Sequence, residues 1–438
     1  MSHKEILARS IATRLREAGF TAYLAGGCVR DRLLGHEPND FDVATDAPAE
    51  TVQGLFERTV PVGVQFGVVL VVLEGQPFEV ATFRADAAYV DGRRPASVRF
   101  SSATEDAARR DFTINGMFLD PVTDEVIDYV GGRDDLRAGI IRAIGDPSAR
   151  IYEDRLRMLR AVRFAARFGF VIEPTTFDAI RNAAPHLGDI ALERIGDEIV
   201  RILCEGNARR GFELLDATGL LPMVLPEVAA LKGVEQSPDY HPEGDVFTHT
   251  LLLLAELEQP SETLALGALL HDIAKPACAQ RRDDRITFYG HCEQGADIAV
   301  AVCQRLRRSR EVWERVAWLV SNHLRLIHAA DMRVSTLKRF LAHDGINELL
   351  ALARLDALAS NKDLRHYEFC RAKQAEFGAA QIKPPSLIRG RDLLALGLDA
   401  GPRFREILDA VEEAQLEGRL TTHTAAMEWV RAHYLQHE

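Results

Sequence analysis

Two short stretches near the N-terminus contain residues whose types and spacing suit the binding and transfer of phosphate groups. The pair Gly26-Gly27 follows the apolar stretch Tyr23-Leu24-Ala25, and Arg30 comes shortly after it. This pattern predicts a strand, a tight turn and the start of a helix. Backbone N–H groups at such a turn can cradle phosphates, and Arg30 would add positive charge beside them.

The second stretch, Asp40-Phe41-Asp42, offers two carboxylates. Alternate residues of a strand share a face, so Asp40 and Asp42 would project together while Phe41 packs into the core. Two carboxylates on one face can bind a divalent metal ion, and with the glycine turn they favour nucleotidyl transfer with Mg²⁺. Glu79, on a later predicted strand, could be a third catalytic carboxylate that helps remove a proton from the attacking hydroxyl. The alternative for Glu79 is a surface acid at a strand end.

Arginines recur at helical spacing further along the chain. The stretch 151–168 has the pattern of one helix, on which a stripe of arginines lies opposite an apolar face. The stripe comprises Arg157, Arg160, Arg163 and Arg167. A nucleic-acid substrate requires such positive charge, because its phosphates must be neutralised. We therefore expect Arg160 and Arg163 to meet a triphosphate or an RNA 3′ end.

The same predicted helix places Asp154 and Arg157 one turn apart, so that their heads can converge on one planar ligand. Cytosine and adenine both present an amine donor beside a ring-nitrogen acceptor, whereas uracil and guanine present a carbonyl beside an N–H donor. A carboxylate next to a guanidinium matches the first pattern and repels the second. The pair is expected to accept C and A; the alternative is an ordinary surface ion pair.

A further set of histidines and aspartates lies in the second half of the chain, in a region with helical patterns. The set is His249, His271, Asp272, His291, His323 and Asp356. Imidazoles and carboxylates from several helices suit a transition metal ion such as Ni, Mn or Co, or Mg²⁺. Lys275, just after His271 and Asp272, could hold a phosphate oxygen.

The elements that must position these residues divide the chain into parts. A predicted amphipathic helix at 4–18 and antiparallel strands between 59 and 83 indicate an α+β head over residues 1–145. Helical patterns follow, broken by prolines. They predict an all-α neck at 146–230, a metal-binding helical domain at 231–375 and a helical tail at 376–438.

Composition limits the class of protein. The 438 residues are 47% hydrophobic and 27% charged, which excludes disorder and gives enough chain for several domains. The formal net charge is −12, so binding of nucleic acid would depend on local clusters of arginine. No apolar run is long enough for a membrane span and no signal region opens the chain, which favours a cytoplasmic protein. The six cysteines lack a CxxC pair and are interpreted as packing residues in a reducing compartment.

The sequence GGCVRDRLLGHEPNDFDVAT, from Gly26 to Thr45, resembles the signature of class II nucleotidyltransferases of the polymerase-β superfamily. These are the CCA-adding enzymes and bacterial poly(A) polymerases. RRDFTING, from Arg109 to Gly116, resembles their RRDFTINA block. The resemblance implies a polymerase-β-like head with a mixed sheet. The nucleotide-binding residues that it and the patterns above indicate are Gly26, Gly27, Arg30, Arg110, Asp111, Asn115, Asp154, Arg157, Arg160 and Arg163.

The same family resemblance extends further. The histidine and aspartate set is similar to the H…HD…D pattern of HD phosphohydrolases, which implies metal-assisted hydrolysis of a phosphoester. Residues 388–420 resemble a C-terminal sequence usually placed near the tRNA elbow. The implied substrates are tRNA, ATP and CTP, with no membrane and no obligate protein partner.

Two features favour CCA addition over poly(A) synthesis. The loop YVDGRRPASVRF at 89–100 matches one that CCA-adding enzymes use to switch from C to A, and the basic segment typical of poly(A) polymerases is missing from VGVQFGVV at 62–69. Poly(A) polymerase, a CC- or A-adding enzyme, and an HD phosphohydrolase or non-catalytic protein with an RNA-binding head stay open as alternatives.

Overall fold

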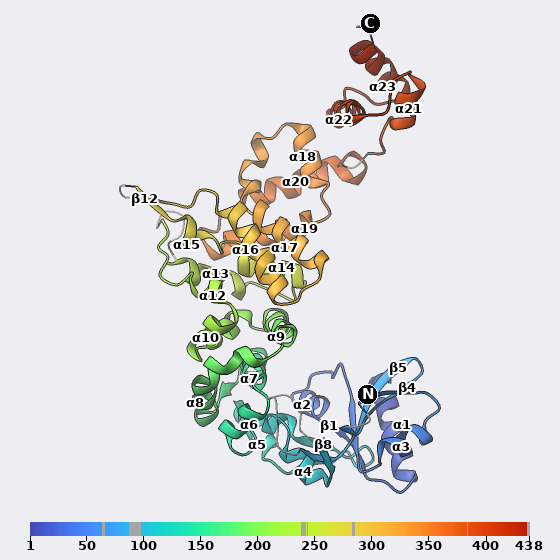
Figure 1. Ribbon diagram of the computed structural model, residues 1–438, viewed down its shortest axis with the longest axis vertical. Coiled ribbons are helices and arrows are strands. Elements are labelled where there is room, and N and C mark those ends of the chain that lie inside the picture. Colours follow the sequence, from blue (N-terminus) through green and yellow to red (C-terminus); the bar gives the residue numbers. More distant parts are fainter. Residues whose placement is uncertain are drawn as a thin grey trace. The chain divides into compact units, whose positions relative to one another are not determined.

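The computed structural model describes residues 1–63, 66–86, 98–237, 242, 244–282, 285–382 and 384–435. They belong to two compact units, which are described separately. The first consists of Met1–Ala229 with Arg305–Arg308, and the second of Ala230–Gln304 with Ser309–Glu438. Figure 1 colours the chain from the blue mixed sheet of the first unit to the orange and red helices of the second.

A seven-stranded sheet forms the core of the head. Its strands are β1 (Ala22–Ala25), β2 (Asp42–Thr45), β3 (Thr59–Gly63), β4 (Val68–Leu73), β5 (Gln76–Thr82), β8 (Met117–Leu119) and β9 (Val126–Asp128). They lie in the order β3-β4-β5-β2-β1-β8-β9. β2 and β5 run parallel, and the other neighbours run antiparallel. The strands predicted between residues 59 and 83 are therefore confirmed.

The register of the parallel strands β2 and β5 brings two acidic residues side by side. Val43 lies opposite Val80, so the preceding residues of the two strands, Asp42 and Glu79, are neighbours. Val43 and Val80 are buried in the core, and alternation along a strand turns Asp42 and Glu79 to the opposite face.

Helices surround the sheet and continue into the neck. They are α1 (His3–Glu17), α2 (Gly27–Leu33), α3 (Ala49–Leu55), α4 (Ala103–Ala108), α5 (Gly132–Ala138), α6 (Pro147–Glu153), α7 (Arg157–Phe168), α8 (Pro174–Ala183), α9 (Leu192–Cys204), α10 (Ala208–Ala217), α11 (Leu221–Val224) and α12 (Pro226–Ala229). Short 3₁₀ helices lie at η2 (Thr113–Asn115) and η3 (Ala184–Asp189), and short strand pairs at β6 (Arg84–Asp86) with β7 (Val98–Phe100) and β10 (Ile140–Ile141) with β11 (Val171–Ile172). Ile11 and Leu15 of α1 are fully buried, and this helix packs on β1 and β2.

The single helix predicted over 151–168 is wrong. The chain forms α6 up to Glu153 and starts α7 at Arg157, with extended backbone at Asp154. The reason lies in the Asp154 side chain, whose Oδ1 accepts a hydrogen bond from the Leu156 amide at 3.1 Å. Aspartate competes for backbone N–H groups in this way and so favours helix starts over helix interiors.

The second unit is mainly helical. Its helices are α13 (Val246–Ala255), α14 (Glu262–Leu270), α15 (Lys275–Cys278), α16 (His291–Arg305), α17 (Arg310–Asn322), α18 (Val334–Leu341), α19 (Ile346–Ala359), α20 (Arg365–Ile382), α21 (Gly390–Ala395), α22 (Pro402–Leu416) and α23 (His423–Val430), with η4 (Arg325–Asp331) and η5 (Arg431–Leu435). The hairpin of β12 (Gln280–Arg282) and β13 (Arg285–Thr287) precedes α16. α14 contacts α13, α17 and α19, and α21 to α23 share a small core around Leu393 and Ile407.

The predicted fold class, an α+β head with a mixed sheet followed by helical parts, is confirmed. Among the helices of the described residues, none combines the length and apolar character that crossing a membrane requires.

Candidate functional site

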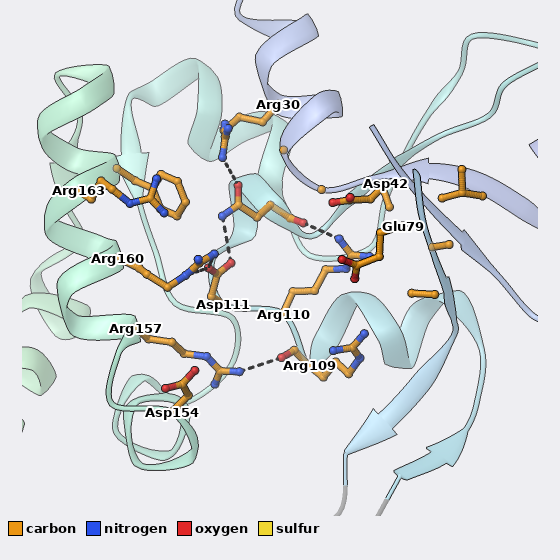
Figure 2. Close-up of a pocket in the computed structure, with 18 of the residues that line it drawn as sticks. Arg30, Asp42, Glu79, Arg109, Arg110, Asp111, Asp154, Arg157, Arg160 and Arg163 are labelled. Carbon is orange, nitrogen blue, oxygen red and sulfur yellow. Dashed lines mark hydrogen bonds and ion pairs between the residues drawn. The ribbon is translucent and has the colours of Figure 1, made fainter. Parts of the chain in front are cut away.

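A cavity of about 460 Å³ opens between the head sheet and α7, within the first unit. This volume is within the range of about 300–1,000 Å³ that small-molecule sites occupy. Figure 2 shows acidic side chains on the sheet side and a row of arginines on the helix side. The four arginines of the predicted stripe, Arg157, Arg160, Arg163 and Arg167, all line the cavity.

The acidic wall consists of Asp42 from β2 and Glu79 from β5. Asp42 is reached by solvent, but the cavity walls still withdraw its carboxyl from bulk water. Burial and then the neighbouring Glu79 charge raise the pKa of Asp42 to about 6. Carboxylates that repel each other in this way suit a bound divalent cation, and oxygen donors are the ligands that Mg²⁺ prefers. The donor set therefore fits a magnesium ion.

Asp40 lies differently from the prediction that pairs it with Asp42 on one strand face. It precedes β2, its side chain is 86% exposed, and its Oδ1 accepts from Lys4 Nζ at 2.7 Å. Phe41 between the two is buried, as predicted. The charge of Asp40 still acts on Asp42, where it contributes to the raised pKa. Asp40 is therefore close to the acidic wall, although it is not among the described residues that line the cavity.

The turn at Gly26 requires glycine. Its φ is +73°, and a Cβ there would lie 3.0 Å from Arg110 Nη1. Arg110 in turn donates to Asn115 O at 3.3 Å and to Asp106 Oδ2 at 3.1 Å. Gly27 begins α2, and both glycines line the cavity. The predicted phosphate-binding turn and Arg110 therefore lie at the same wall of the cavity. Asp106, the buried carboxylate that binds Arg110, was not predicted from the sequence.

A chain of hydrogen bonds joins α2, the RRDFTING segment and α7. Arg30 Nη1 donates to Asn115 Oδ1 at 2.6 Å, and Asn115 Nδ2 donates to Asp111 Oδ1 at 3.0 Å. Arg160 Nη2 donates to Asp111 Oδ2 at 2.6 Å. Although burial opposes ionisation, the Arg160 charge and these hydrogen bonds lower the pKa of Asp111 to about 2. The chain fixes Arg160 beside the cavity.

Asp154 and Arg157 both line the cavity, at the junction of α6 and α7. Arg157 is held in place because its Nη1 donates to Glu153 Oε2 at 2.7 Å and its Nη2 donates to Arg109 O at 3.2 Å. Asp154 accepts from Arg194 of α9, at 3.3 Å on Oδ1 and 2.9 Å on Oδ2. Sequence reasoning missed Arg194; a contact across forty residues leaves no local signal.

Arg163 is more deeply buried, and more fully engaged in ion pairs, than expected for a residue that binds a phosphate. Its side chain is 5% exposed, and it donates to Glu198 Oε2 at 2.7 Å and to Glu205 Oε2 at 3.0 Å. Both carboxylates come from α9 or its end. The guanidinium of Arg163 therefore joins α7 to α9 as well as lining the cavity.

The predicted switching loop at 89–100 lies outside the described residues except for 98–100. The segment 62–69 is described apart from residues 64 and 65.

In the second unit, the predicted histidine and aspartate set comes together from α13, α14, α16, α17 and α19 with their adjoining turns. His249 Nε2 lies 3.0 Å from Asp356 Oδ1, and His271 Nε2 lies 3.1 Å from Asp272 Oδ2. Asp272 Oδ1 lies 3.6 Å from His291 Nε2 and 3.8 Å from His323 Nε2. Asp272 is therefore the centre of the cluster.

The imidazoles of this cluster are oriented as metal ligands usually are. The Nδ1 atoms of His271, His291 and His323 lie 2.9, 2.7 and 2.7 Å from backbone carbonyl oxygens. Such bonds fix the ring and leave Nε2 for an ion. His271 Nε2 is buried and makes no hydrogen bond of good geometry. Burial lowers the pKa of His323 to about 4, so its ring is neutral at pH 7. The donors fit a divalent ion.

A second cavity, of about 360 Å³, reaches this cluster and is lined by Asp272, Lys275, His291, His323 and Asp356 among others. Lys275 Nζ lies 2.7 Å from Asp272 Oδ2 and donates to Gln236 Oε1 at 2.6 Å. The six cysteines form no disulfide, and Cys292 Sγ lies 3.7 Å from His291 Nε2. Its position beside the cluster differs from the interpretation of every cysteine as a packing residue.

Three family models match the chain. The model "Poly A polymerase head domain" matches residues 22–142, "Probable RNA and SrmB- binding site of polymerase A" matches 169–232, and "HD domain" matches 245–361.

Curated relatives and solved structures agree with these matches. The CCA-adding enzyme of Bacillus pumilus is 32% identical over 423 residues, which cover 95% of this chain and 94% of the relative. The CCA-adding enzyme of Ligilactobacillus salivarius is 41% identical over 307 residues, covering 67% and 76%.

Among solved structures, the Bacillus stearothermophilus CCA-adding enzyme in complex with CTP has a TM-score of 0.67 at 28% identity and covers 99% of each chain. The Thermotoga maritima CCA-adding enzyme complexed with tRNA has a TM-score of 0.60 at 21% identity, over 98% and 94%, which speaks for the fold alone. The chain belongs to the family of the CCA-adding enzymes, and it is a nucleotidyltransferase.

Proposed function

We propose that this nucleotidyltransferase adds CCA to the 3′ end of tRNA from CTP and ATP, without a nucleic-acid template. The observation that carries the proposal is the head cavity, which combines Asp42 and Glu79 on one wall with Asp154 and Arg157 on the other. One wall suits the chemistry of transfer and the other suits the choice of base. Relatives named for CCA addition over nearly the whole chain support the same activity.

The residues proposed to hold Mg²⁺ are Asp42 and Asp40, with Glu79 beside them. The ion, when bound, supplies positive charge that stabilises the phosphate groups during displacement of pyrophosphate. Glu79 is a neighbour of Asp42 in the sheet register and is proposed to accept the proton of the attacking tRNA 3′ hydroxyl. Lys4 Nζ already binds Asp40 Oδ1, so this lysine would compete with the ion for the Asp40 carboxylate.

The remaining cavity residues are proposed to bind the nucleoside triphosphate. Gly26 and Gly27 leave their wall free of side chains, and Arg110 adds positive charge beside them. Arg160 is held toward the cavity by Asp111. The roles of the buried groups are proposed to be indirect: Arg30, Asn115 and Asp111 position the segment that carries Arg110, and Arg163 fixes α7 against α9.

Selection of the base is proposed to rest on Asp154 and Arg157. A carboxylate can accept the exocyclic amine of cytosine or adenine, and a guanidinium N–H can donate to the adjacent ring nitrogen. Uracil and guanine would set a carbonyl against the carboxylate and an N–H against the guanidinium. Arg194 and Glu153 keep the two heads at fixed positions, so the protein side of the recognition is built before the nucleotide arrives.

A second activity is proposed for the histidine and aspartate cluster: hydrolysis of a phosphoester such as a 2′,3′-cyclic phosphate or 2′-phosphate at an RNA end. What supports it is the convergence of six ligand-type side chains beside a cavity that also exposes Lys275. A divalent ion held there would activate water.

We propose the limits 1–145 for the head, 146–230 for the neck, 231–375 for the HD domain and 376–438 for the tail, and the cytoplasm as the place of action.

The test of transfer uses the pure full-length chain with Mg²⁺ and three tRNA transcripts, which end before CCA, after C and after CC. Each labelled nucleotide is offered singly. We expect C on the first two transcripts, A on the third, and no U or G. A long adenosine product would instead indicate a poly(A) polymerase, and use of the CC-ended transcript alone an A-adding enzyme. Loss of transfer in Asp42→Asn, but not in the exposed control Asp178→Asn, is expected.

The test of the second activity compares His271→Ala with His328→Ala, an exposed histidine of the same unit. We expect His271→Ala to lose bound metal and phosphoesterase activity while it keeps nucleotidyl transfer. If phosphoesterase activity of the pure protein survives in His271→Ala, the proposal for the second site is wrong. If the pure protein incorporates no nucleotide while its phosphoesterase activity is the same in the wild type and in Asp42→Asn, the protein is a phosphohydrolase with an RNA-binding head.

A further inference from the structure

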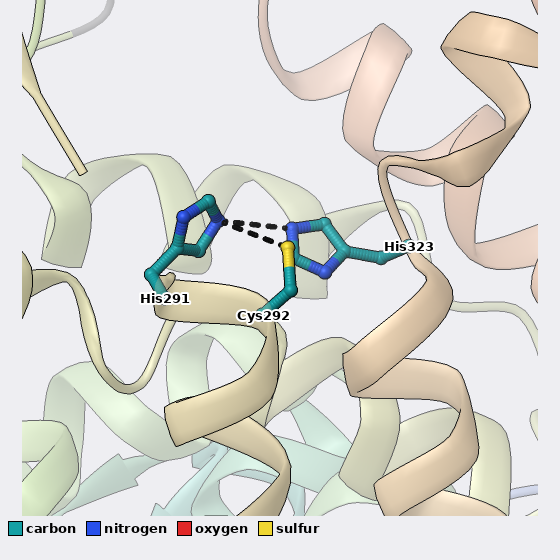
Figure 3. A group of neighbouring side chains, drawn as sticks. All are labelled: His291, Cys292 and His323. Atoms are coloured by element: carbon teal, nitrogen blue, oxygen red, sulfur yellow. Dashed lines mark hydrogen bonds between the residues drawn. The ribbon is translucent and has the colours of Figure 1, made fainter. Parts of the chain in front are cut away.

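We propose that Cys292 is a direct metal ligand of the HD cluster, and that the cluster therefore takes a thiophilic ion such as Zn²⁺ in preference to Mg²⁺ or Mn²⁺. This inference rests on the proposed metal site of the HD domain. It adds a sulfur donor to a set that sequence analysis had limited to imidazoles and carboxylates. Cys292 follows His291 at the start of α16, and both side chains point toward His323 (Figure 3).

The distances among the three donors are those of ligands that share one ion. His291 Nε2 lies 3.4 Å from His323 Nε2 and 3.7 Å from Cys292 Sγ. All three donor atoms lie within 4.8 Å of one another. A tetrahedral zinc ion with Zn–N of about 2.0–2.1 Å and Zn–S of about 2.3 Å separates its ligands by about 3.3–3.6 Å. The His291–His323 and His291–Cys292 separations are within a few tenths of an ångström of these values, and the Cys292 and His323 donors lie within 4.8 Å of each other.

Asp272, which groups with His249 and His271, also lies beside the two imidazoles of the Cys292 group. Asp272 Oδ1 lies 3.6 Å from His291 Nε2 and 3.8 Å from His323 Nε2, on the side of this group, whereas its Oδ2 faces His271 and Lys275. Imidazole nitrogen, carboxylate oxygen and thiolate sulfur are all ligands that zinc takes in proteins. Lys275 would neutralise part of the negative charge that the thiolate adds.

An independent observation points to an ion at the cluster. His271 is 1% exposed; its Nδ1 lies 2.9 Å from Ala268 O, and its Nε2 lies 3.1 Å from Asp272 Oδ2 without the geometry of a hydrogen bond. Leaving a buried polar atom without such a bond is costly, unless the atom is reserved for an ion. His271 lies across Asp272 from the Cys292 group.

The chemistry of the sulfur sets the metal preference. When Cys292 binds, the metal–sulfur bond forms and the thiol proton leaves to solvent, with no change of oxidation state. Soft thiolates select zinc and its borderline neighbours, whereas an all-oxygen set suits magnesium and manganese. Loss of a direct ligand should weaken Zn²⁺ binding by at least about 10-fold, because changes to groups that only support a ligand already cost that much.

The experiment loads the metal-free full-length protein with Co²⁺, which reports its ligands by absorption. The variants are Cys292→Ala and the matched control Cys204→Ala, which removes the other half-buried cysteine from α9. In the wild type and in Cys204→Ala we expect a near-ultraviolet sulfur-to-cobalt charge-transfer band. In Cys292→Ala we expect this band to be lost while visible cobalt bands of the remaining ligands persist. Competition with Zn²⁺ should show the weaker binding.

The possible results distinguish the role of Cys292 from the existence of the HD metal site. Cobalt that binds the wild type without a charge-transfer band, or a band that survives in Cys292→Ala, would overturn the role of Cys292 and leave the HD metal site intact. Failure of the wild type to bind cobalt or zinc at all would overturn both. Nucleotidyl transfer should be unchanged in either cysteine variant.

Discussion

The contact between Arg194 and Asp154 makes a sharp prediction about base selection. Arg194 reaches both oxygens of Asp154, and the two side chains are 25% and 19% exposed. A charge-assisted hydrogen bond in such a partly buried position contributes about 1.5–3 kcal/mol. If this free energy is used to hold Asp154 for the base, Arg194→Ala should reduce kcat/KM for CTP and ATP by about 10- to 150-fold.

The assay is single-nucleotide addition to tRNA transcripts with each of the four nucleotides. Because UTP and GTP gain nothing from a fixed Asp154, we expect their kcat/KM to fall less, so that selectivity decreases. Arg194→Lys should recover only part of the loss, since a lysine cannot reproduce the two-point contact of the guanidinium. The control is Arg201→Ala, an exposed arginine of the same helix with a single long ion pair.

Two results would refute the reasoning. If Arg194→Ala lowers kcat/KM equally for all four nucleotides, the residue supports the fold and does not position Asp154 for a base. If Asp154→Ala itself leaves selectivity unchanged, the carboxylate does not select the base.

Three further predictions concern the acidic groups of the head. Lys4→Met should lower the Mg²⁺ concentration needed for half-maximal transfer, because it frees Asp40 from its lysine partner; an unchanged requirement in both this variant and Asp40→Asn would exclude Asp40 as a ligand. Asp42→Asn should abolish transfer yet stabilise the metal-free protein at pH 7. The pKa of Asp42 is raised to about 6, so ionising this carboxyl destabilises the folded protein; the destabilisation is absent below about pH 4 and complete above about pH 6. Thermal unfolding from pH 4 to 7 should show the gap widening, and a constant gap would contradict the stated cause. Asp111→Asn should destabilise the head by about 2 kcal/mol at pH 7, because a pKa lowered to about 2 gives stability that exists above about pH 4 and is lost toward pH 2; hydrogen exchange in α7 measures it, and an effect that persists at low pH would assign the loss to packing.

Local patterns were enough to predict Asp42 and the glycine turn as parts of one site. Glycine at Gly26 and alternation along β2 are properties of a few consecutive residues, so the sequence displays them directly. The same alternation placed Asp40 with Asp42 and missed Lys4, because β2 starts at Asp42, two residues after Asp40. The closeness of Glu79 depends on the parallel register of β2 and β5, which the sequence could only offer as one of two interpretations.

Long-range partners could not be predicted in this way. The stripe of arginines on α7 was predicted from helical spacing, but spacing cannot tell which carboxylate each arginine pairs with. Arg163 forms ion pairs with Glu198 and Glu205, whereas Arg160 is held beside the cavity by its ion pair with Asp111. The break at Asp154 had a local signal, since aspartate favours the start of a helix, but the helical pattern on both sides concealed it.

In the second unit, the ligand set could be recognised as a group although its members span more than a hundred residues. The histidines and aspartates are distinctive residue types in an apolar helical region, so they were noticed. Cys292 was not, because a cysteine is more often a packing residue, and only the fold brings its sulfur beside His291 and His323.

The most direct test of the central claim is to sequence the 3′ ends of tRNA made by the pure protein when all four nucleotides are present together. The substrate is a transcript that ends before CCA, and Asp42→Asn is run beside the wild type. Our account predicts that the wild type adds C, C and A in that order and then stops, and that the variant adds nothing. Ends with a long adenosine tract, ends that stop at CC, or full extension by Asp42→Asn would contradict it.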